Sequence, residues 1–185
     1  RARMPYNLQD IQQLSSLLPR LEEGCVRLFH GSNIYHSHSI VFDGIQMDLL
    51  QDGADFGPAF YTTPDLSCAV QYMQLAAQLQ SCDGAVVVLD VPNELERMRL
   101  FDLSSDHARW EQVVRECRRP RLWPIDEETK RRLAEAHVVK GPIVANAEEV
   151  DSGADINTEP EEAAEPWTQV AFRAIDGATA VSTQT

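Results

Sequence analysis

Two stretches decide how this sequence is expected to fold: Asp55-Phe-Gly-Pro-Ala-Phe-Tyr-Thr-Thr63 and, upstream of it, Arg27-Leu-Phe-His-Gly-Ser32. Each contains a short apolar run beside polar or aromatic side chains, a pattern typical of a buried strand that ends at functional groups. We therefore expect strands over Val26–Phe29 and Ala59–Thr62. The first delivers His30-Gly31-Ser32 at its end, where the glycine lets a ligand approach the backbone closely.

The segment after the second strand predicts a helix. Thr63 is expected to cap it, with Pro64 at the first helical position, and the helix should run to Gln80. It carries Tyr72, eleven residues after Tyr61. Together these pieces predict a nucleotide pocket between the two strands. The alternative is that both are ordinary packing residues of the core or its rim.

The rest of the chain mixes short strands with helices, which indicates an α+β domain. Residues 33–55 are expected to form a long loop, and such loops are more often functional than structural. The continuous apolar run over residues 85–91 indicates a central strand. Further helices are predicted over 7–19, 105–119 and 126–136, and further strands over 138–139, 143–144 and 168–172.

The domain boundaries follow from composition. We expect a flanking helix in residues 1–24, one domain over residues 25–181 and a frayed tail over residues 182–185. Acidic residues with few bulky apolar neighbours predict a solvated loop at about residues 147–166. A basic island is expected to form a solvated helix end, and its members are Arg115, Arg118, Arg119 and Arg121.

The composition excludes several classes of partner. The 185 residues carry a net charge of −13, which repels a phosphate backbone, so no nucleic acid is expected to bind. The four cysteines are widely spaced, and His36 and His38 lack a third ligand, so neither a disulfide framework nor a metal site is predicted. No apolar run could cross a membrane, and no secretory signal is visible. We expect an intracellular protein; because the sequence begins with Arg1, secretion stays open as the alternative.

The motifs together resemble the ADP-ribosyltransferase fold of the diphtheria-toxin and poly(ADP-ribose)-polymerase type. His30-Gly31-Ser32 is similar to the first motif of that family, Gly57–Tyr61 is similar to the second, and Tyr72 matches its second tyrosine. A poorly characterised bacterial and fungal branch also resembles this chain at the Asp-Phe-Gly start and at two further stretches, Gly141–Asn146 and Gln169–Phe172. The resemblance spans about Arg27 to Val181. It implies a split core of mixed and antiparallel β-sheets with flanking helices.

The resemblance implies that NAD⁺ is the substrate and that no metal is needed. The backbone of Gly31 would hold the nicotinamide carboxamide, and Tyr61 and Tyr72 would sandwich the cationic ring. His30 would bind the adenosine ribose. Supporting roles are implied for Ser32 at the strand end and for Thr62 at the rim.

One departure from the family lies at the third motif. Vigorous transferases of this type place a Glu on the last strand, where its charge stabilises the cation that forms as nicotinamide leaves. Here the position is Gln169, which can accept a bond from the ribose hydroxyl without supplying the charge. The catalytic residues implied are therefore Gln169, Tyr61 and His30. Members of the family that hydrolyse NAD⁺ also carry Gln, so this residue does not exclude activity.

Three functions follow as hypotheses. The first is an ADP-ribosyltransferase that acts on a protein or small-molecule acceptor. The second is an NAD⁺ glycohydrolase, in which water is the acceptor. The third is a catalytically silent module that binds a nucleotide or a partner, because a fold does not fix a function.

Overall fold

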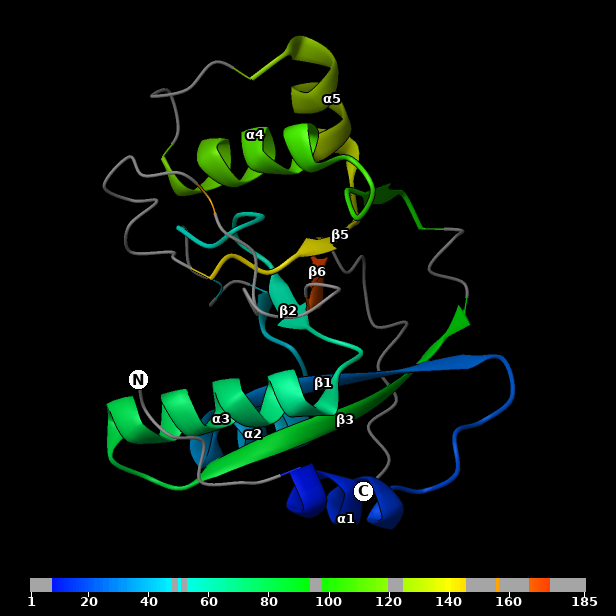
Figure 1. Cartoon of the computed structure of the whole chain (residues 1–185), viewed down its shortest axis with the longest axis vertical. Helices are drawn as coiled ribbons and strands as arrows, with labels where there is room; N and C mark the ends of the chain where they lie inside the picture. The colour runs from blue at the N-terminus through cyan, green and yellow to red at the C-terminus, as the bar shows by residue number, and fades with distance from the viewer. Residues whose placement is uncertain are drawn as a thin grey trace. The chain divides into compact units, whose positions relative to one another are not determined.

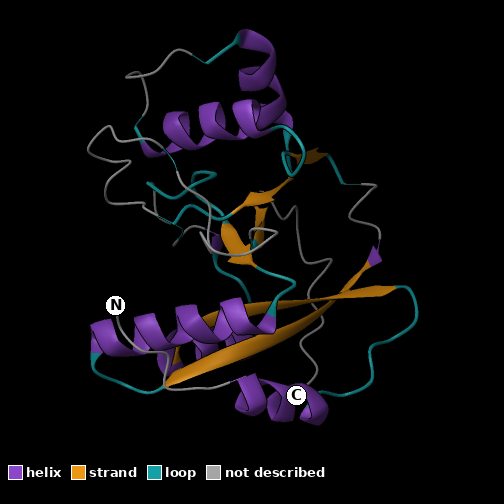
Figure 2. Cartoon of the chain, in the orientation of Figure 1, coloured by secondary structure: helices purple, strands orange, loops and turns teal. Residues whose placement is uncertain are grey.

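The computed structural model describes residues 8–47, 50, 53–93, 98–119, 125–145, 156 and 167–173, except for the side chains of residues 8–10. Helices and strands are interspersed along the chain, and the strands form two sheets (Figures 1 and 2). The α+β class and the mixed and antiparallel sheets expected from the sequence are confirmed. The chain divides into two compact units, one with the described residues of 1–44 and 62–93 and the other with those of 45–61 and 94–180.

The first unit is a two-stranded antiparallel sheet with helices packed on it. Strand β1 (Cys25–Asn33) pairs with β3 (Gly84–Pro92), and the register places Gly31 opposite Val86. Helix α3 (Leu66–Gln80) lies along the sheet, as Figure 1 shows. Helices α1 (Leu8–Leu17) and α2 (Ile34–Asp43) complete the unit. Its core holds the buried apolar residues Leu28, Phe29, Cys68, Ala69, Val70, Val87, Leu89 and Val91.

Three predictions for the strands and the long loop of the first unit were wrong. Strand β1 runs four residues past Phe29, so His30-Gly31-Ser32 lies inside the strand and not at its end. The segment expected to be a loop begins with helix α2, because Asn33 accepts a hydrogen bond from the backbone N–H of His36 at 2.9 Å and so caps it. Strand β3 is not a central strand, since within the described residues its sheet contains only β1.

The second unit is a four-stranded sheet covered by two helices. The strand order is β2-β6-β5-β4, with β4 parallel to β5 and β6 antiparallel to it. Buried side chains of the sheet, helices and loops form one cluster around Trp110 and Phe56. The elements are β2 (Phe60–Thr62), β4 (Leu100–Asp102), α4 (His107–Arg118), α5 (Glu127–Glu135), β5 (Val138–Pro142) and β6 (Thr168–Phe172). The boundary between the units falls within β2, because Thr62 is the first residue of the segment assigned to the first unit.

The second unit confirms the predicted helices over 105–119 and 126–136 to within two residues at each end, and strand β6 is confirmed. The break expected at Gly141-Pro142 was wrong: β5 runs through both residues. An added methyl group at Gly141 would lie 3.0 Å from the Phe56 ring and 3.1 Å from Trp110, so a glycine lets the sheet pack closely on the core. The acidic segment lies outside the described residues apart from Ile156, which is buried. The tail also lies outside them.

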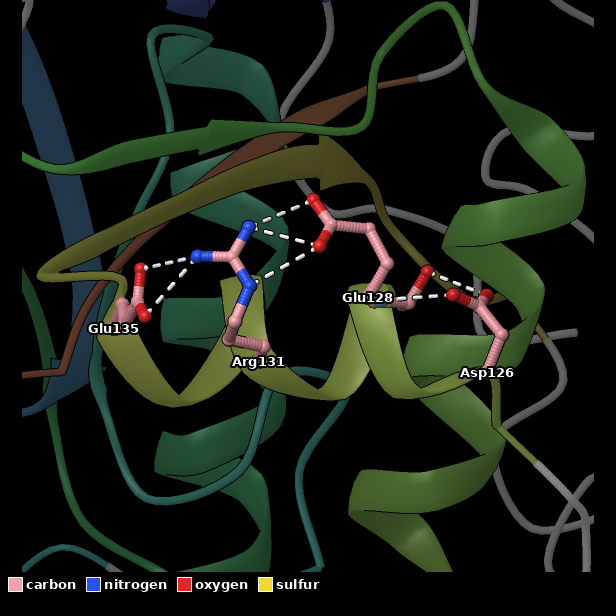
Figure 3. Close-up of polar contacts among 5 residues, drawn as sticks. Asp126, Glu128, Arg131 and Glu135 are labelled. Carbon is pink, nitrogen blue, oxygen red and sulfur yellow. Dashed lines mark hydrogen bonds and ion pairs between the residues drawn. The ribbon is translucent and has the colours of Figure 1, made fainter.

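Aspartates cap three helices by accepting bonds from the first backbone N–H groups. They are Asp65 for α3, Asp106 for α4 and Asp126 for α5. Asp65 and not Thr63 therefore caps α3, because Thr63 is held by strand β1. On the exposed face of α5, Arg131 lies between Glu128 and Glu135 and bonds to both, which raises its pKa (Figure 3).

The four cysteines are free thiols, and Cys68 is buried. Among the described residues, no three His, Cys, Asp or Glu side chains come together as metal ligands. No helix in the described part of the chain combines the length and apolar character that a membrane crossing needs.

Candidate functional site

The residues expected to form the site fall into two groups. His30, Gly31, Ser32, Thr62 and Tyr72 belong to the first unit, whereas Tyr61 and Gln169 belong to the second. Different interactions hold the two groups in place: strand pairing and helix packing in the first unit, and hydrogen bonds and an ion pair in the second.

Gly31 presents its backbone at the open edge of the two-stranded sheet. The N–H of Phe29 donates to the Thr63 carbonyl at 2.8 Å, and the N–H of Thr63 donates back to the Phe29 carbonyl at 2.9 Å. The polar groups of Phe29 therefore point away from β3. Residues two apart in a strand share an edge, so the N–H and C=O of Gly31 point away from β3 as well. Within the described residues, no strand pairs with Gly31 on that edge.

The same glycine is pressed against helix α3. A methyl group at Gly31 would lie 1.8 Å from the Ala69 carbonyl oxygen and 2.7 Å from the Met73 nitrogen. Both are backbone atoms, so no side chain could move aside. From the sequence, Gly31 was expected to let a ligand approach the backbone closely. The structure shows that helix α3 approaches this glycine closely. Glycine is required here because the first turns of α3 lie directly on β1.

Tyr72 lies on the helix that covers Gly31. It falls between Ala69 and Met73, the two residues whose backbones approach the glycine. Tyr72 is 43% exposed and lies within the fifteen-residue helix α3. Tyr72 therefore presents a partly exposed aromatic side chain on the helix whose backbone approaches Gly31.

His30 and Ser32 point to the opposite face of β1 from Gly31, because successive residues of a strand alternate. His30 is half-buried, and Ser32 is buried. Thr62 is buried next to the bridge that Thr63 makes with Phe29. Because these three residues are buried or half-buried, they fit supporting roles around the strand.

Tyr61 is fixed by its hydroxyl group. The hydroxyl accepts a bond from the backbone N–H of Phe56 at 2.9 Å and donates to the Gly57 carbonyl at 2.8 Å. Burial raises the pKa of the phenol well above its usual range, and the bond from Phe56 partly opposes this shift. The ring is therefore held as a neutral phenol, stacked against Phe56 with centroids 6.5 Å apart. The two hydrogen bonds and the ring contact therefore hold the Tyr61 ring in a fixed position.

Gln169 is the centre of a buried polar network in the second unit. Its Nε2 donates to Asp55 Oδ2 at 2.6 Å and to the Pro142 carbonyl at 3.1 Å. The other Asp55 oxygen, Oδ1, accepts from Arg118 at 2.7 Å, and Oδ2 also accepts from the Val144 N–H at 3.3 Å. The Gln169 side chain thus uses both of its N–H bonds inside the protein.

This network corrects the prediction for the basic island. Arg118 was expected in a solvated helix end, but its side chain is only 12% exposed and forms an ion pair with Asp55. Arg115 is also buried, and it pairs with Glu111 one helical turn away at 2.8 Å. Burial is permitted because each guanidinium has a carboxylate partner.

Asp55 is the functional candidate that sequence reasoning missed. The aspartate was interpreted only as the start of a turn. A signal was present, since Asp-Phe-Gly is one of the stretches shared with the look-alike branch. Its partners Arg118 and Gln169 lie 63 and 114 residues further along the chain, and such contacts leave no local pattern.

The first unit can bind a planar amide at a strand edge, and the second can present an amide oxygen from a fixed glutamine.

A model for a family described as "Protein of unknown function (DUF3990)" matches residues 27–185. Among curated proteins, none matches the chain.

Proposed function

Because the chain belongs to the DUF3990 family, described as being of unknown function, we propose its function from the site itself. It is an NAD⁺-dependent ADP-ribosyltransferase that cleaves the bond between nicotinamide and ribose. ADP-ribose then passes to an acceptor, which is a protein or a small molecule. The match to the family over residues 27–185 covers all of the residues used here.

The observation that carries the proposal is the open edge at Gly31. The residue offers one donor and one acceptor on the same side of a strand. A carboxamide has the complementary pair, a carbonyl and an NH₂ group. It can therefore form two parallel hydrogen bonds with Gly31, as a neighbouring strand would. Nicotinamide is an aromatic ring with this carboxamide attached.

Tyr72 supports the binding of that ring within the first unit, because it is partly exposed on helix α3, whose backbone approaches Gly31. Tyr61 belongs to the second unit, where its hydroxyl is bonded to the backbone of Phe56 and Gly57. Aromatic faces attract a cationic ring, and each such contact contributes about 0.5–1 kcal/mol at an exposed site. In the proposal the pyridinium of NAD⁺ is bound in this way, and His30 binds the adenosine ribose as the resemblance implies.

The test separates the two hydrogen bonds at Gly31. Calorimetry with nicotinamide should show binding, whereas nicotinic acid should bind far more weakly because its carboxylate offers no N–H to the Gly31 carbonyl. Benzamide, which keeps the carboxamide on a different ring, should bind as nicotinamide does. Equal binding of nicotinamide and nicotinic acid, or no binding of either at millimolar concentrations, would refute the carboxamide site.

Activity is tested by following free nicotinamide after incubation with NAD⁺. Release that requires a cell lysate supports transfer to an acceptor. Release in buffer alone supports NAD⁺ glycohydrolase activity, and one observation favours this second candidate: position 169 supplies an amide rather than the charge of a vigorous transferase. Binding without release under either condition would leave only the silent nucleotide-binding module.

A further inference from the structure

We infer that Asp55 is a positioning residue: it fixes the amide of Gln169 so that Oε1 is the atom left to accept a hydrogen bond from the nicotinamide ribose. This inference rests on the proposed function. The inference extends the proposed function, because it assigns the orientation of the Gln169 amide to Asp55, a residue that precedes the second motif in sequence. Asp55, Arg118 and Gln169 all belong to the second unit.

The neighbours of Gln169 determine which end of its amide is which. The two atoms within bonding distance of Nε2 are a carboxylate oxygen of Asp55 and the carbonyl oxygen of Pro142. Both can only accept hydrogen bonds. If the amide were flipped, Oε1 would face two acceptors in a buried site, at the cost of two unmade bonds. The NH₂ group therefore points into the protein.

The remaining acceptor of Gln169 is Oε1. Within the described residues, no donor reaches this oxygen, while both N–H groups are used. Gln169 as a whole is only 6% exposed, so its side chain has little freedom to rotate. A ribose hydroxyl needs a fixed acceptor of this kind, one that none of the described donors occupies.

The arrangement also explains why the residue is not a glutamate. Asp55 is itself buried, and its carboxylate forms an ion pair with Arg118. A carboxylate at position 169 would lie against Asp55 Oδ2 in place of a donor now at 2.6 Å. Two carboxylates at that distance cannot both be ionised. The chain thus retains the hydrogen-bond acceptor of the third motif and gives up its charge.

The first test compares Asp55→Asn with Asp106→Asn. Asp106 caps α4 in the same unit and lies outside the network, and asparagine caps a helix as well as aspartate does. In Asp55→Asn we expect the amide oxygen to face the Arg118 guanidinium, which can only donate. The new NH₂ group then opposes Gln169 Nε2, so the Gln169 amide must turn and bury Oε1. The expected result is a fall in kcat of about tenfold or more, with the KM for NAD⁺ changed less than about threefold. Asp106→Asn should keep both values.

The second test needs no variant and no catalysis. In the wild-type protein, NMR should show Gln169 side-chain NH₂ protons that exchange with water far more slowly than those of exposed glutamines such as Gln12. Fast exchange would overturn the inference, as would a kcat unchanged in folded Asp55→Asn. Should wild-type protein release no nicotinamide from NAD⁺, the proposed function fails, and the exchange rate alone decides whether the network fixes the amide. Should Asp55→Asn fail to fold, the wild-type exchange rate again decides.

Discussion

The edge at Gly31 and the network at Gln169 treat polar groups in opposite ways. At Gly31, the backbone N–H and C=O face an edge that no described strand occupies. At Gln169, each donor meets an internal acceptor, and an ion pair holds the acceptor in turn. The first arrangement leaves a backbone donor and a backbone acceptor available to a ligand. The second uses both N–H groups of Gln169 to hold the side chain in place and leaves only Oε1 as an acceptor.

The contrast shows two ways to prepare a binding group. A strand edge is fixed by the sheet and the helix behind it, so the backbone can be offered without any cost in side-chain entropy. A glutamine side chain is flexible and must be held by partners before it can act as a fixed acceptor. Predictions for the two regions therefore differ in kind: close packing dominates the first, and electrostatics dominates the second.

The largest effect is expected from Arg118→Ala. Removing the guanidinium leaves the Asp55 carboxylate buried without its ion-pair partner, and breaking a buried pair in this way costs about 3–5 kcal/mol. Denaturant unfolding measures the loss. Arg118→Lys, which keeps the charge, should recover part of it. If Arg118→Ala is as stable as wild type, the network is not a rigid element of the second unit.

Gly31→Ala should destabilise the protein by about 3 kcal/mol, since the new methyl group overlaps the backbone of α3. The control is Gly24→Ala, where the backbone φ is +78° and no atom lies within 4 Å; strain alone should cost about 1 kcal/mol there. Comparable losses at the two sites would mean that α3 moves away from β1 easily. Thermal unfolding of both variants decides.

Gln169→Glu should lose about 1–3 kcal/mol of stability, because a carboxylate would replace the donor that Asp55 and Pro142 require. The double variant Asp55→Asn with Gln169→Glu reverses the polarity of that contact and should regain part of the loss. The two single variants and the double variant form a cycle whose coupling energy measures the contact. Additive losses would show that the two side chains do not interact.

Tyr72→Ala should weaken the binding of nicotinamide by about fivefold, a loss of about 1 kcal/mol for one aromatic contact, with little change in stability because the side chain is 43% exposed. Leu79→Ala removes another exposed apolar side chain from the same helix and should leave the affinity unchanged. Calorimetry with both variants tests whether Tyr72 contacts the ring. An unchanged affinity in Tyr72→Ala would remove this residue from the proposed site.

The smallest effect belongs to Arg131→Ala on the exposed face of α5, where the guanidinium bonds to Glu128 and Glu135 in solvent (Figure 3). Exposed ion pairs contribute little to stability. We expect an unfolding midpoint close to that of wild type at both low and high salt concentration. A loss approaching that of Arg118→Ala would contradict the distinction between buried and exposed pairs.

The sequence predicts the elements whose local pattern and fold agree. Strand β6 ends in the apolar run Val-Ala-Phe, and α4 and α5 start at aspartates that cap them. Helix α2 was missed because its sequence, Ile-Tyr-His-Ser-His-Ser-Ile-Val-Phe-Asp, is rich in β-branched and aromatic residues with weak helix propensity. Its cap at Asn33 and its packing on the sheet outweigh that preference.

The candidate site divides along the same line. Gly31 and the two tyrosines could be proposed as site residues from motif spacing, because they lie within one span of 42 residues, 31–72. The partners of Gln169 could not be identified, since Asp55 is 114 residues away from it. Nothing in the sequence near Asp55 specifies an arginine on α4 or an amide on the last strand. Long-range pairing of this kind is decided by the tertiary fold.

The Pro142 carbonyl joins the network to the aromatic core, because it accepts from the Trp110 indole nitrogen at 3.0 Å as well as from Gln169. Trp110 is completely buried, and indole emission responds to the hydrogen bond at its nitrogen. The protein thus contains its own optical reporter: a substrate that draws on Gln169 should shift tryptophan fluorescence, and the shift should vanish when Trp110 is replaced by phenylalanine.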